Sequence, residues 1–253
     1  MLETFNITKF FGGNRVLDKV SLKVPIESIT MLIGPNGSGK TTLLNIVSGI
    51  YKPDHGKVLF NNKDVTGLPP CRLYDMGMVR TFQVPALFTS MTVLENLLLS
   101  VKIKGETPLT AIFRMKWLKQ EKEVIDRALS ILDILGIGHL WDAPASTLSG
   151  GQLKLLELGR IFMNNPKLAL LDEPLAGINP SLADNLLKRL RELKEDYKIS
   201  MLIVEHRLDI LAPYTDYAYA MNQGKIISKG DPNEVLEDPR VIEAYLGEAE
   251  STC

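Results

Sequence analysis

One segment of the sequence combines glycines with a lysine and a threonine at the spacing of a phosphate-binding loop. Residues 34–41 read Gly-Pro-Asn-Gly-Ser-Gly-Lys-Thr, which fits the pattern GxxxxGK[ST]. Glycines allow successive backbone N–H groups to turn inward around phosphate oxygens, and a helix that follows adds its partial positive charge. Lys40 is expected to reach the β- and γ-phosphates of a nucleotide, and Thr41 to give its hydroxyl to Mg²⁺. The residues expected to bind the nucleotide here are Gly34, Asn36, Gly37, Ser38, Gly39, Lys40, Thr41 and Thr42.

Two carboxylates follow an apolar run further along the sequence. Residues 168–171 are Leu-Ala-Leu-Leu, as expected for a strand buried in a parallel sheet, and Asp172 and Glu173 come next. On a strand beside the phosphate loop, Asp172 would hold Mg²⁺ through its water shell. Glu173, one residue further, would polarise the water that attacks the phosphate. An apolar strand that ends in Asp-Glu is usually structural, and the presence of Lys40 is what favours the catalytic interpretation.

A third segment, residues 148–152, reads Leu-Ser-Gly-Gly-Gln and opens a predicted helix. A serine and two glycines at the start of a helix leave N–H groups exposed with little side-chain bulk, which is typical of an anion site. The candidate residues are Ser149, Gly150, Gly151 and Gln152. The simpler alternative, a serine N-cap, explains Ser149 but neither the two successive glycines nor the glutamine.

The elements that must position these residues follow from the hydrophobic pattern. Residues 4–32 are expected to form short strands with a turn at 11–14, and residues 93–158 are helical in character. Beyond them strand and helix alternate, with an amphipathic helix over 182–193, so a parallel α/β sheet with a helical insertion is predicted. The phosphate loop precedes a helix over 42–47, a context that favours a nucleotide site over a glycine-rich turn with no ligand. The other strands are expected at 29–33, 58–60, 168–171 and 200–204.

Composition excludes several classes of protein. The chain has 253 residues, 45% hydrophobic and 23% charged, close to the average for a globular domain, so disordered, collagen-like and disulfide-scaffold proteins are excluded. The formal net charge is −1, from 29 Lys and Arg against 30 Asp and Glu, which disfavours a general nucleic-acid-binding protein. The cysteines, Cys71 and Cys253, are far apart, and no metal–thiolate site is expected. Since the chain shows no 18-residue apolar run and no secretion signal, we expect it to be soluble and cytoplasmic, which leaves room for a membrane-embedded partner.

Taken in order, five motifs resemble those of the ATP-binding subunits of ABC transporters, and the resemblance covers essentially the whole chain. The motifs are the phosphate loop, Gln83 in Val79-Arg80-Thr81-Phe82-Gln83, residues 148–152, Asp172-Glu173, and His206 in Ile203-Val204-Glu205-His206. This resemblance implies a P-loop NTPase fold: an α/β protein with a mainly parallel core sheet, an N-terminal antiparallel β subdomain and an inserted α-helical subdomain. It implies a single ATP-binding domain over residues 1–253, with the helical subdomain at about 88–158 and a C-terminal extension at 225–253.

The resemblance also implies roles for single residues. In the family an aromatic residue stacks on adenine, and Phe11 matches that place, with Val16 packed beside it. Phe10 is the rival, and either phenylalanine could instead belong to the core. Gln83 matches a residue that contacts Mg²⁺ and the attacking water while its loop senses the transmembrane partner, and His206 matches a histidine that contacts the γ-phosphate. A structural or solvent-facing position is expected for the remaining histidines, His55 and His139.

The chain carries one phosphate loop and one copy of residues 148–152, and in the family these segments do not meet within one subunit. The resemblance therefore implies two ATPase subunits, identical or not, packed head to tail about a two-fold axis, so that Ser149 to Gln152 of one cover the γ-phosphate bound to Lys40 of the other. It further implies ATP and Mg²⁺ as cofactors, permease subunits and indirectly a substrate-binding protein as partners, and no nucleic acid. The expected location is peripheral, on the cytoplasmic side of the cell membrane. One departure is Asn179, which stands where the family often has an aspartate.

Several local strings resemble a narrower group, the ATPases of branched-chain amino-acid importers. They are residues 79–83, Glu173-Pro174-Leu175-Ala176-Gly177, Glu205-His206-Arg207-Leu208-Asp209 and Tyr245-Leu246-Gly247, together with a lengthened helical insertion at 101–122. Related ATPases move urea, amides or lipids, so these substrates stay open. The basic segment 114–122, which contains Trp117, is either a solvated helix face or a contact near the membrane partner or lipid headgroups.

An ABC ATPase outside transport is the remaining alternative. DNA-repair relatives usually carry a long coiled coil before the signature segment, and translation-associated relatives usually carry two ATPase cassettes; the sequence shows neither. A stand-alone nucleotide-binding regulator would not need catalytic residues. The presence of Glu173, Gln83 and His206 argues for turnover of ATP and not for passive binding.

Overall fold

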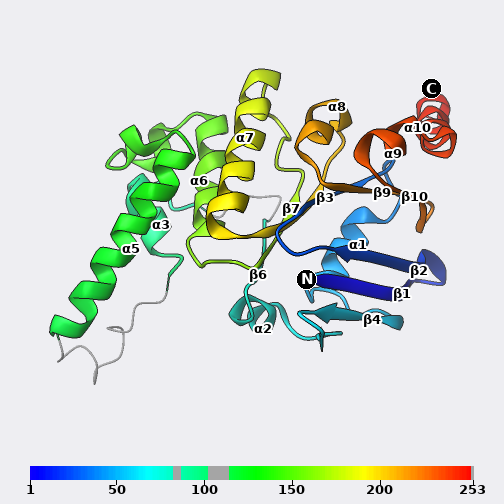
Figure 1. Ribbon diagram of the computed structural model, residues 1–253, viewed down its shortest axis with the longest axis horizontal. Helices are drawn as coiled ribbons and strands as arrows, with labels where there is room; N and C mark the ends of the chain where they lie inside the picture. The colour runs from blue at the N-terminus through cyan, green and yellow to red at the C-terminus, as the bar shows by residue number, and fades with distance from the viewer. Residues whose placement is uncertain (82–86, 102–113, 252–253) are drawn as a thin grey trace. The chain divides into compact units, whose positions relative to one another are not determined.

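The computed structural model of the chain describes residues 1–81, 87–101 and 114–251 and divides the chain into two compact units (Figure 1). The first unit comprises residues 1–80, 167–176 and 190–253, and the second comprises residues 81–166 and 177–189. The expected α/β fold class is confirmed, because the first unit contains one antiparallel sheet and one mainly parallel sheet. Each unit is described by itself below.

A six-stranded sheet with the strand order β10-β9-β3-β8-β7-β6 organises the first unit (Figure 1). Neighbouring strands are parallel except for β9 and β10, which form an antiparallel pair. Strands β3, β7 and β8 are buried at every position, and this is why they read in the sequence as nearly unbroken apolar runs. The strands span Ile29–Ile33 (β3), Met78–Arg80 (β6), Leu168–Asp172 (β7), Ser200–Val204 (β8), Tyr217–Asn222 (β9) and Lys225–Gly230 (β10).

A four-stranded antiparallel sheet in the same unit has the order β2-β1-β4-β5. Gly12 and Gly13 join β1 to β2 with φ values of 53° and 89°, the positive values that a tight hairpin turn requires. The first two strands are 10 and 11 residues long, and are not the short strands that we expected. Register shifts between Thr4 and Lys9 interrupt the alternation of buried and exposed residues, so the sequence pattern breaks where the strand continues. The strands span Leu2–Phe11 (β1), Asn14–Val24 (β2), His55–Phe60 (β4) and Lys63–Asp64 (β5).

Helices and apolar side chains complete the core of the first unit. Helix α1 begins at Lys40 and not at residue 42, because Gly39, at φ 103°, ends the phosphate loop in a conformation that favours glycine. One buried hydrophobic cluster joins the two sheets: Leu2 and Phe60 come from the antiparallel sheet and Leu170 from the parallel one. Burial of each such side chain contributes about 1.5–3 kcal/mol. The helices span Lys40–Val47 (α1), Pro70–Asp75 (α2), Leu208–Leu211 (α8), Pro232–Glu237 (α9) and Pro239–Ser251 (α10).

The second unit is built from packed helices, of which α3, α5 and α6 lie side by side (Figure 1). These three helices converge at Gly159, where a Cβ atom would come within 3.5 Å of Leu97 and 3.6 Å of Ile131. Helix α3 begins with a capping box, in which Thr92 and Glu95 each bind the backbone N–H of the other. The helices span Val93–Leu98 (α3), Arg114–Ile134 (α5) and Gly150–Phe162 (α6), and residues 180–189 of α7 (Pro180–Tyr197) belong to the same unit.

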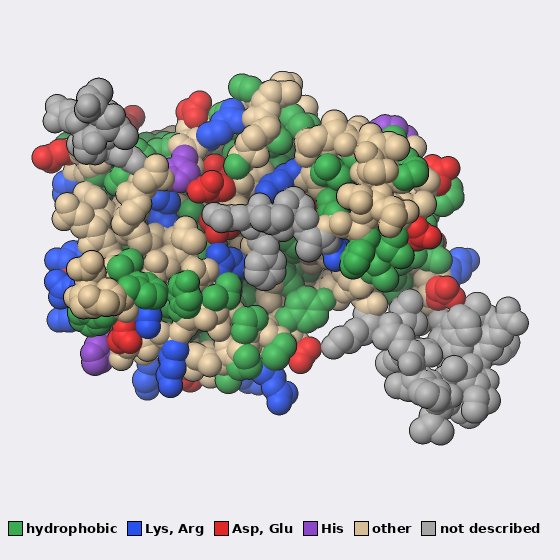
Figure 2. Space-filling view, turned by 180° about the vertical axis from the view of Figure 1, so that it is seen from behind, with side chains coloured by type: hydrophobic (Ala, Val, Ile, Leu, Met, Phe, Trp, Pro, Cys, Tyr) green, Lys and Arg blue, Asp and Glu red, His purple; other side chains and the backbone are tan. Residues whose placement is uncertain are grey.

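The surface mixes polar and apolar groups. On the face shown in Figure 2, exposed hydrophobic side chains lie in small groups among charged side chains. Within the described ranges, no helix is both long and apolar enough to cross a membrane. Cys71 is exposed with a free thiol, and His55 and His139 are exposed, in agreement with the solvent-facing alternative.

Candidate functional site

The residues of the first unit that are assigned to phosphate, Mg²⁺ and catalysis gather at the carboxyl ends of neighbouring parallel strands. The phosphate loop follows β3, and His206 lies just after β8. Asp172 and Glu173 mark the end of β7, and Arg80 ends β6. These strands are adjacent in the order β3, β8, β7, β6. Open α/β sheets bind ligands at this edge, because the polar residues that follow each strand meet there.

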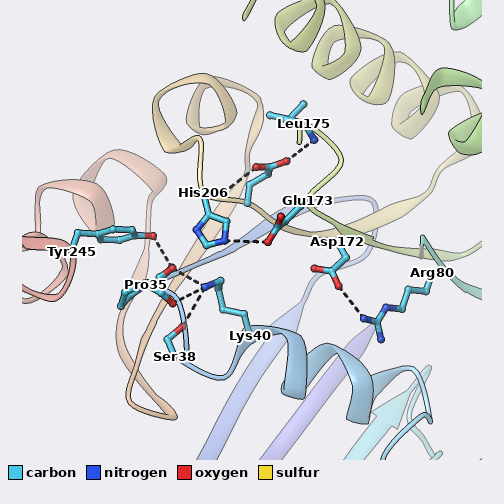
Figure 3. A network of polar contacts seen from close by, with 11 residues as sticks. Pro35, Ser38, Lys40, Arg80, Asp172, Glu173, Leu175, His206 and Tyr245 are labelled. Atoms are coloured by element: carbon cyan, nitrogen blue, oxygen red, sulfur yellow. Dashed lines mark hydrogen bonds and ion pairs between the residues drawn. The ribbon is translucent and has the colours of Figure 1, made fainter. Parts of the chain in front are cut away.

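Lys40 is held at the centre of the phosphate loop by oxygens of the loop itself (Figure 3). Its Nζ donates to the carbonyl oxygens of Gly34 and Pro35 at 2.7 and 2.8 Å and lies 3.4 Å from Ser38 Oγ. The lysine is 5% exposed, and a buried ammonium group is costly unless oxygens surround it. The loop therefore fixes the position of a positive charge at the edge of the sheet, as a site for phosphate groups requires.

Atoms that pack against the phosphate loop explain why two of its positions, 34 and 39, are glycine. A Cβ atom on Gly34, whose φ is +149°, would lie 2.1 Å from the carbonyl oxygen of Met221 in β9. A Cβ atom on Gly39 would lie 2.7 Å from Leu17 Cδ2 and 3.1 Å from the carbonyl oxygen of Val16 in β2. Val16, expected near the nucleotide, thus lies against the loop and is half-buried. Of the other expected ligands, Ser38 is buried, Thr42 is half-buried, and the exposed ones are Asn36, Gly37 and Thr41.

Arg80 joins the end of β7 to helix α1, and Figure 3 shows its contact with Asp172. Its Nη2 donates to Asp172 Oδ2 at 3.0 Å, and the two side chains are only 10% and 2% exposed. Its Nη1 donates to Asn45 Oδ1 at 2.6 Å and to Ser48 Oγ at 2.9 Å, both near the end of α1. Sequence reasoning assigned no role to Arg80 beyond its place in a motif. Its place at the end of β6, the strand that pairs with β7, is visible only in the structure.

The chemistry of Asp172 and Thr41 fits a nucleotide-bound Mg²⁺. Mg²⁺ takes oxygen ligands, usually one or two from carboxylate or hydroxyl side chains with the rest from substrate phosphates and water. The part of the chain that the structure describes holds no cluster of three or more His, Cys, Asp or Glu side chains that could bind a metal alone. When bound, Mg²⁺ neutralises charge on the phosphate oxygens. Gln83, the other expected ligand, falls outside the described residues.

Glu173 and His206 face each other from the ends of neighbouring strands (Figure 3). Glu173 Oε1 lies 3.1 Å from His206 Nε2, and both side chains are about one-third exposed, at 36% and 35%. The backbone of Glu173 has φ +49°, which is uncommon for a residue with a side chain and costs free energy. Its N–H donates to the carbonyl of Val204 at 2.9 Å, and its own carbonyl accepts the N–H of Ala176 at 3.1 Å. These bonds hold the strained turn that directs the carboxylate toward the histidine.

Glu205 links the segments that carry this pair, and sequence reasoning missed it. Its side chain is buried, with Oε1 accepting the N–H of Leu175 at 2.6 Å and Oε2 accepting the N–H of His206 at 3.0 Å. Burial is the main cause that raises the pKa of the Glu205 carboxyl above its ordinary value, and the nearby charge of Glu173 raises it further. A carboxylate that directly follows the apolar strand β8 was the signal that could have identified it.

Phe11 lies at the hairpin turn with another aromatic ring beside it. The ring of Tyr51 is 5.4 Å away, edge-on at 71°, and Lys9 Nζ is 5.4 Å from the centre of the Phe11 ring. Phe10 is exposed as well, and its backbone N–H donates to Asp54 at 2.7 Å. Because both phenylalanines are exposed, the alternative that either belongs to the core is wrong. Only Phe11 has an aromatic neighbour among the described contacts, and Tyr51 was not anticipated.

In the second unit, residues 149–152 form the start of α6. Ser149 Oγ accepts the N–H of Gln152 at 3.4 Å, and Gln152 Oε1 accepts the N–H of Ser149 at 2.8 Å, which completes a capping box. A Cβ atom on Gly151 would lie 2.4 Å from Leu182 Cδ2, so a larger residue there would require the end of the Leu182 side chain to move. Gly150 is exposed, and within the described ranges nothing lies within 4 Å of its Cβ position. Ser149 is thus an N-cap, as the simpler alternative predicted. Neither capping nor packing explains why residue 150 is glycine.

Asn179, the residue that departs from the family pattern, has a structural partner in the second unit. Its Oδ1 accepts the N–H of Leu182 at 2.8 Å, next to the first residue of α7. An asparagine is among the best residues for this capping position, so the exchange of aspartate for asparagine keeps the start of the helix intact. The negative charge that an aspartate would place there is lost.

Known proteins that are similar to this chain extend these observations. Residues 17–176 match the family described as ABC transporter, and residues 225–251 match the family described as branched-chain amino acid ATP-binding cassette transporter. The chain is 49% identical over 251 residues to the probable branched-chain amino acid transport ATP-binding protein LivG of Archaeoglobus fulgidus, covering 99% of this chain and 97% of that one. The protein of the same name from Methanocaldococcus jannaschii is 48% identical over 252 residues, with 98% of each chain covered. A crystal structure of the ADP conformation of MJ1267, an ATP-binding cassette of an ABC transporter, matches with a TM-score of 0.85 at 47% identity and 98% coverage of both chains.

Proposed function

Because the chain belongs to the family of ABC transporter ATP-binding subunits and is an ATPase of that family, we propose that its ATP hydrolysis powers the import of branched-chain amino acids. The observation that carries the substrate class is the match of residues 225–251 to the branched-chain amino acid ATP-binding cassette family. The archaeal relatives, aligned over nearly their whole length, are named for the same transport. Urea, amides and lipids are the alternative substrates.

The proposed chemical step is attack of water on the γ-phosphate of ATP. Glu173 accepts the proton of the attacking water, and His206, 3.1 Å from it, orients the carboxylate and contacts the γ-phosphate. Lys40 places its positive charge at the β- and γ-phosphates, supported by its fixed position in the loop. Thr41 and Asp172 are the residues that hold Mg²⁺, and Gln83 is assigned to Mg²⁺ and the water on its motif alone.

The adenine of ATP is proposed to stack on Phe11. The exposed ring at the β1–β2 turn supports this role, since an adenine base needs a free aromatic face. Val16 packs beside the base, and its position against Gly39 places it next to the phosphate loop. Phe10, equally exposed, is the alternative platform.

The working form is proposed to be a head-to-tail dimer of ATPase subunits. The chain has one phosphate loop and one segment 149–152, and two copies related by a two-fold axis would form two equivalent composite sites. The capped start of α6, with exposed Gly150, supports a role for that segment in covering the γ-phosphate of the other subunit. Hydrolysis then removes the shared phosphate and lets the interface open.

The dimer is proposed to bind two permease subunits at the cytoplasmic face of the cell membrane, with a substrate-binding protein on the other side. The test is uptake by proteoliposomes that hold this chain with its permease subunits and binding protein. We expect ATP-dependent uptake of labelled leucine, isoleucine and valine, and loss of uptake in the Lys40→Ala variant. Urea, acetamide and phospholipid are the comparison substrates. Preferred transport of any of them, with no uptake of leucine, would overturn the proposed substrate.

A further inference from the structure

The C-terminal helix α10 reaches the phosphate loop through one hydroxyl group (Figure 3). The backbone N–H of Gly34, the first residue of the loop, donates to Tyr245 Oη at 2.7 Å. Tyr245 lies 211 residues further along the chain and is half-buried. Nothing in the phosphate-loop motif calls for this partner, because the motif contains only residues 34–41.

The helix is oriented to make this contact. Val241, one turn before Tyr245, is 2% exposed, so this side of α10 packs against the first unit. Ile242 follows Val241, and Leu246 follows Tyr245. Their side chains lie on the exposed side of the helix and are 47% and 63% exposed. Tyr245 therefore lies at the boundary between the packed and the exposed sides of the helix, and its hydroxyl reaches the loop.

Gly34, the residue that Tyr245 binds, also binds Lys40. The carbonyl oxygen of Gly34 accepts Lys40 Nζ at 2.7 Å, while the N–H of Gly34 is bound by Tyr245. Both polar groups of Gly34 are thus fixed, one by α10 and one by the lysine. Glycine at φ +149° has no side chain to restrict its backbone, so these two bonds set the orientation of its peptide groups.

A second contact from the same part of the chain holds the other side of the loop. The N–H of Gly224, in the turn between β9 and β10, donates to the carbonyl oxygen of Ser38 at 3.0 Å. The carbonyl of Gly224 accepts the N–H of Asp18 in β2 at 2.9 Å. The chain from Gly224 onward therefore contacts the loop at Gly34 and at Ser38, on either side of the exposed residues Asn36 and Gly37.

We propose that Tyr245 is a positioning residue for nucleotide binding: it orients the Gly34 peptide and thereby keeps Lys40 and the loop ready for phosphate. The C-terminal extension then contributes directly to nucleotide affinity. This rests on the proposed role of residues 34–41 as the ATP site. Because Tyr245 contacts the loop backbone and not the reacting phosphate, we expect its loss to raise KM and to leave kcat near its wild-type value.

The test compares two tyrosine-to-phenylalanine variants of the full chain. Tyr245→Phe removes the acceptor of the Gly34 N–H, and Tyr219→Phe removes an acceptor of the Lys23 N–H, 2.9 Å away, outside the loop. The readouts are the Kd for ADP with Mg²⁺ by calorimetry, KM and kcat for ATP, and hydrogen exchange of the Gly34 amide by NMR. For Tyr245→Phe we expect the Kd and KM to rise about threefold to tenfold, from the usual worth of one hydrogen bond, with faster exchange at Gly34. Tyr219→Phe should leave the Kd, the KM and the exchange rate of the Gly34 amide near the wild-type values.

The outcomes separate this inference from the proposed ATP site. Equal affinities for the two variants and the wild type, or tighter binding by Tyr245→Phe, would overturn the role of Tyr245. An equal loss of affinity in both variants would overturn it too, since the effect would then be general destabilisation. If the wild type failed to bind ADP, or Lys40→Ala bound it as tightly as the wild type, the assignment of the loop itself would be wrong.

Discussion

Arg80 donates to Asp172 from the neighbouring parallel strand, with 3.0 Å between Nη2 and Oδ2, and both side chains are nearly inaccessible to solvent. The same guanidinium group binds Asn45 and Ser48 of α1 through Nη1. One planar group thus holds the carboxylate assigned to Mg²⁺ in a fixed relation to the helix that begins with Lys40 and Thr41. A residue to which no part in the chemistry is assigned thus holds the carboxylate in position.

Replacement of Arg80 should therefore lower both stability and activity. Arg80→Ala leaves the buried carboxylate of Asp172 without this cation, and breaking a buried ion pair on one side costs about 3–5 kcal/mol. Arg80→Lys keeps the charge but lacks the planar guanidinium group that reaches both α1 and Asp172. We therefore expect its stability and activity to lie between those of the wild type and Arg80→Ala. Urea unfolding measures the free energy, and ATPase rates at saturating Mg²⁺ measure the activity. Arg191→Ala, at an exposed pair with Glu195, should change stability by less than about 1 kcal/mol. An equal effect at both arginines would contradict the role of Arg80.

Glu173→Gln should stop hydrolysis and leave ATP binding in place. A general base contributes about 10²–10⁴-fold to a rate, so phosphate release should fall by at least about 100-fold. If the composite site closes on ATP as proposed, the variant should accumulate as an ATP-bound dimer, which light scattering after gel filtration would detect. Glu195→Gln, at an exposed helical position, is the control and should hydrolyse ATP like the wild type. Phosphate release at the wild-type rate by Glu173→Gln would rule out this residue as the base.

His206→Ala should slow hydrolysis more than it weakens binding. Loss of one hydrogen-bond donor aimed at the transition state costs about 100-fold to 1,000-fold in kcat. His206→Gln keeps a donor at the end of the side chain and should recover part of the rate, which a purely structural role would not predict. His139→Ala, at an exposed position in the second unit, serves as the control. Single-turnover measurement of phosphate release separates the chemical step from ATP binding.

Local hydrophobic pattern located three of the four strands that carry the site, β3, β7 and β8, but not the three-residue strand β6. Residues 29–33 and 200–204 are strands as expected, and the strand expected at 168–171 includes one more residue, Asp172. Buried parallel strands show no alternation, so an apolar run bounded by polar residues marks them well. The long strands β1 and β2 were predicted poorly, because register shifts disturb the period-2 pattern on which the prediction depends.

Motifs led to the residues that are assigned to the nucleotide, but not to the residues that hold them in place. Arg80 and Asp172 are 92 positions apart, Glu205 and Leu175 are 30 apart, and Tyr245 and Gly34 are 211 apart. Such pairs are created by strand order and helix packing, and spacing along the chain carries no signal for them. The positive φ of Glu173 was equally hidden, because it is imposed by bonds to Val204 and Ala176 against the preference of the residue.

Glu205 should make the stability of the chain depend on pH. Its folded pKa is raised above the ordinary value of 4.5, mainly by burial, so the folded state binds the proton more tightly than the unfolded state. The contribution of Glu205 to the free energy of unfolding is then fully present below pH 4.5 and is lost as pH rises from 4.5 through the folded pKa. Urea midpoints measured across this range should fall more steeply for the wild type than for Glu205→Gln. Glu173→Gln should make the fall shallower, because the charge of Glu173 contributes to the shift.

The control for this measurement is Glu237→Gln, at an exposed position in α9, which should follow the wild-type curve. If Glu205→Gln and the wild type show the same slope, the buried carboxyl does not titrate in this range and the inference from burial is wrong.

Phe11→Ala should weaken nucleotide binding, and Phe10→Ala should not. The two phenylalanines are adjacent and almost equally exposed, at 42% and 41%, so each is a matched control for the other. Stacking of a base on an aromatic ring is worth about 1–3 kcal/mol, which corresponds to a rise in Kd of roughly 5-fold to 150-fold. Calorimetry with ADP gives the Kd, and tripolyphosphate, which has no base, should bind both variants like the wild type. A larger effect at Phe10 would transfer the adenine site to that residue. Weaker binding of tripolyphosphate by Phe11→Ala would show instead that the ring supports the phosphate loop and not the base.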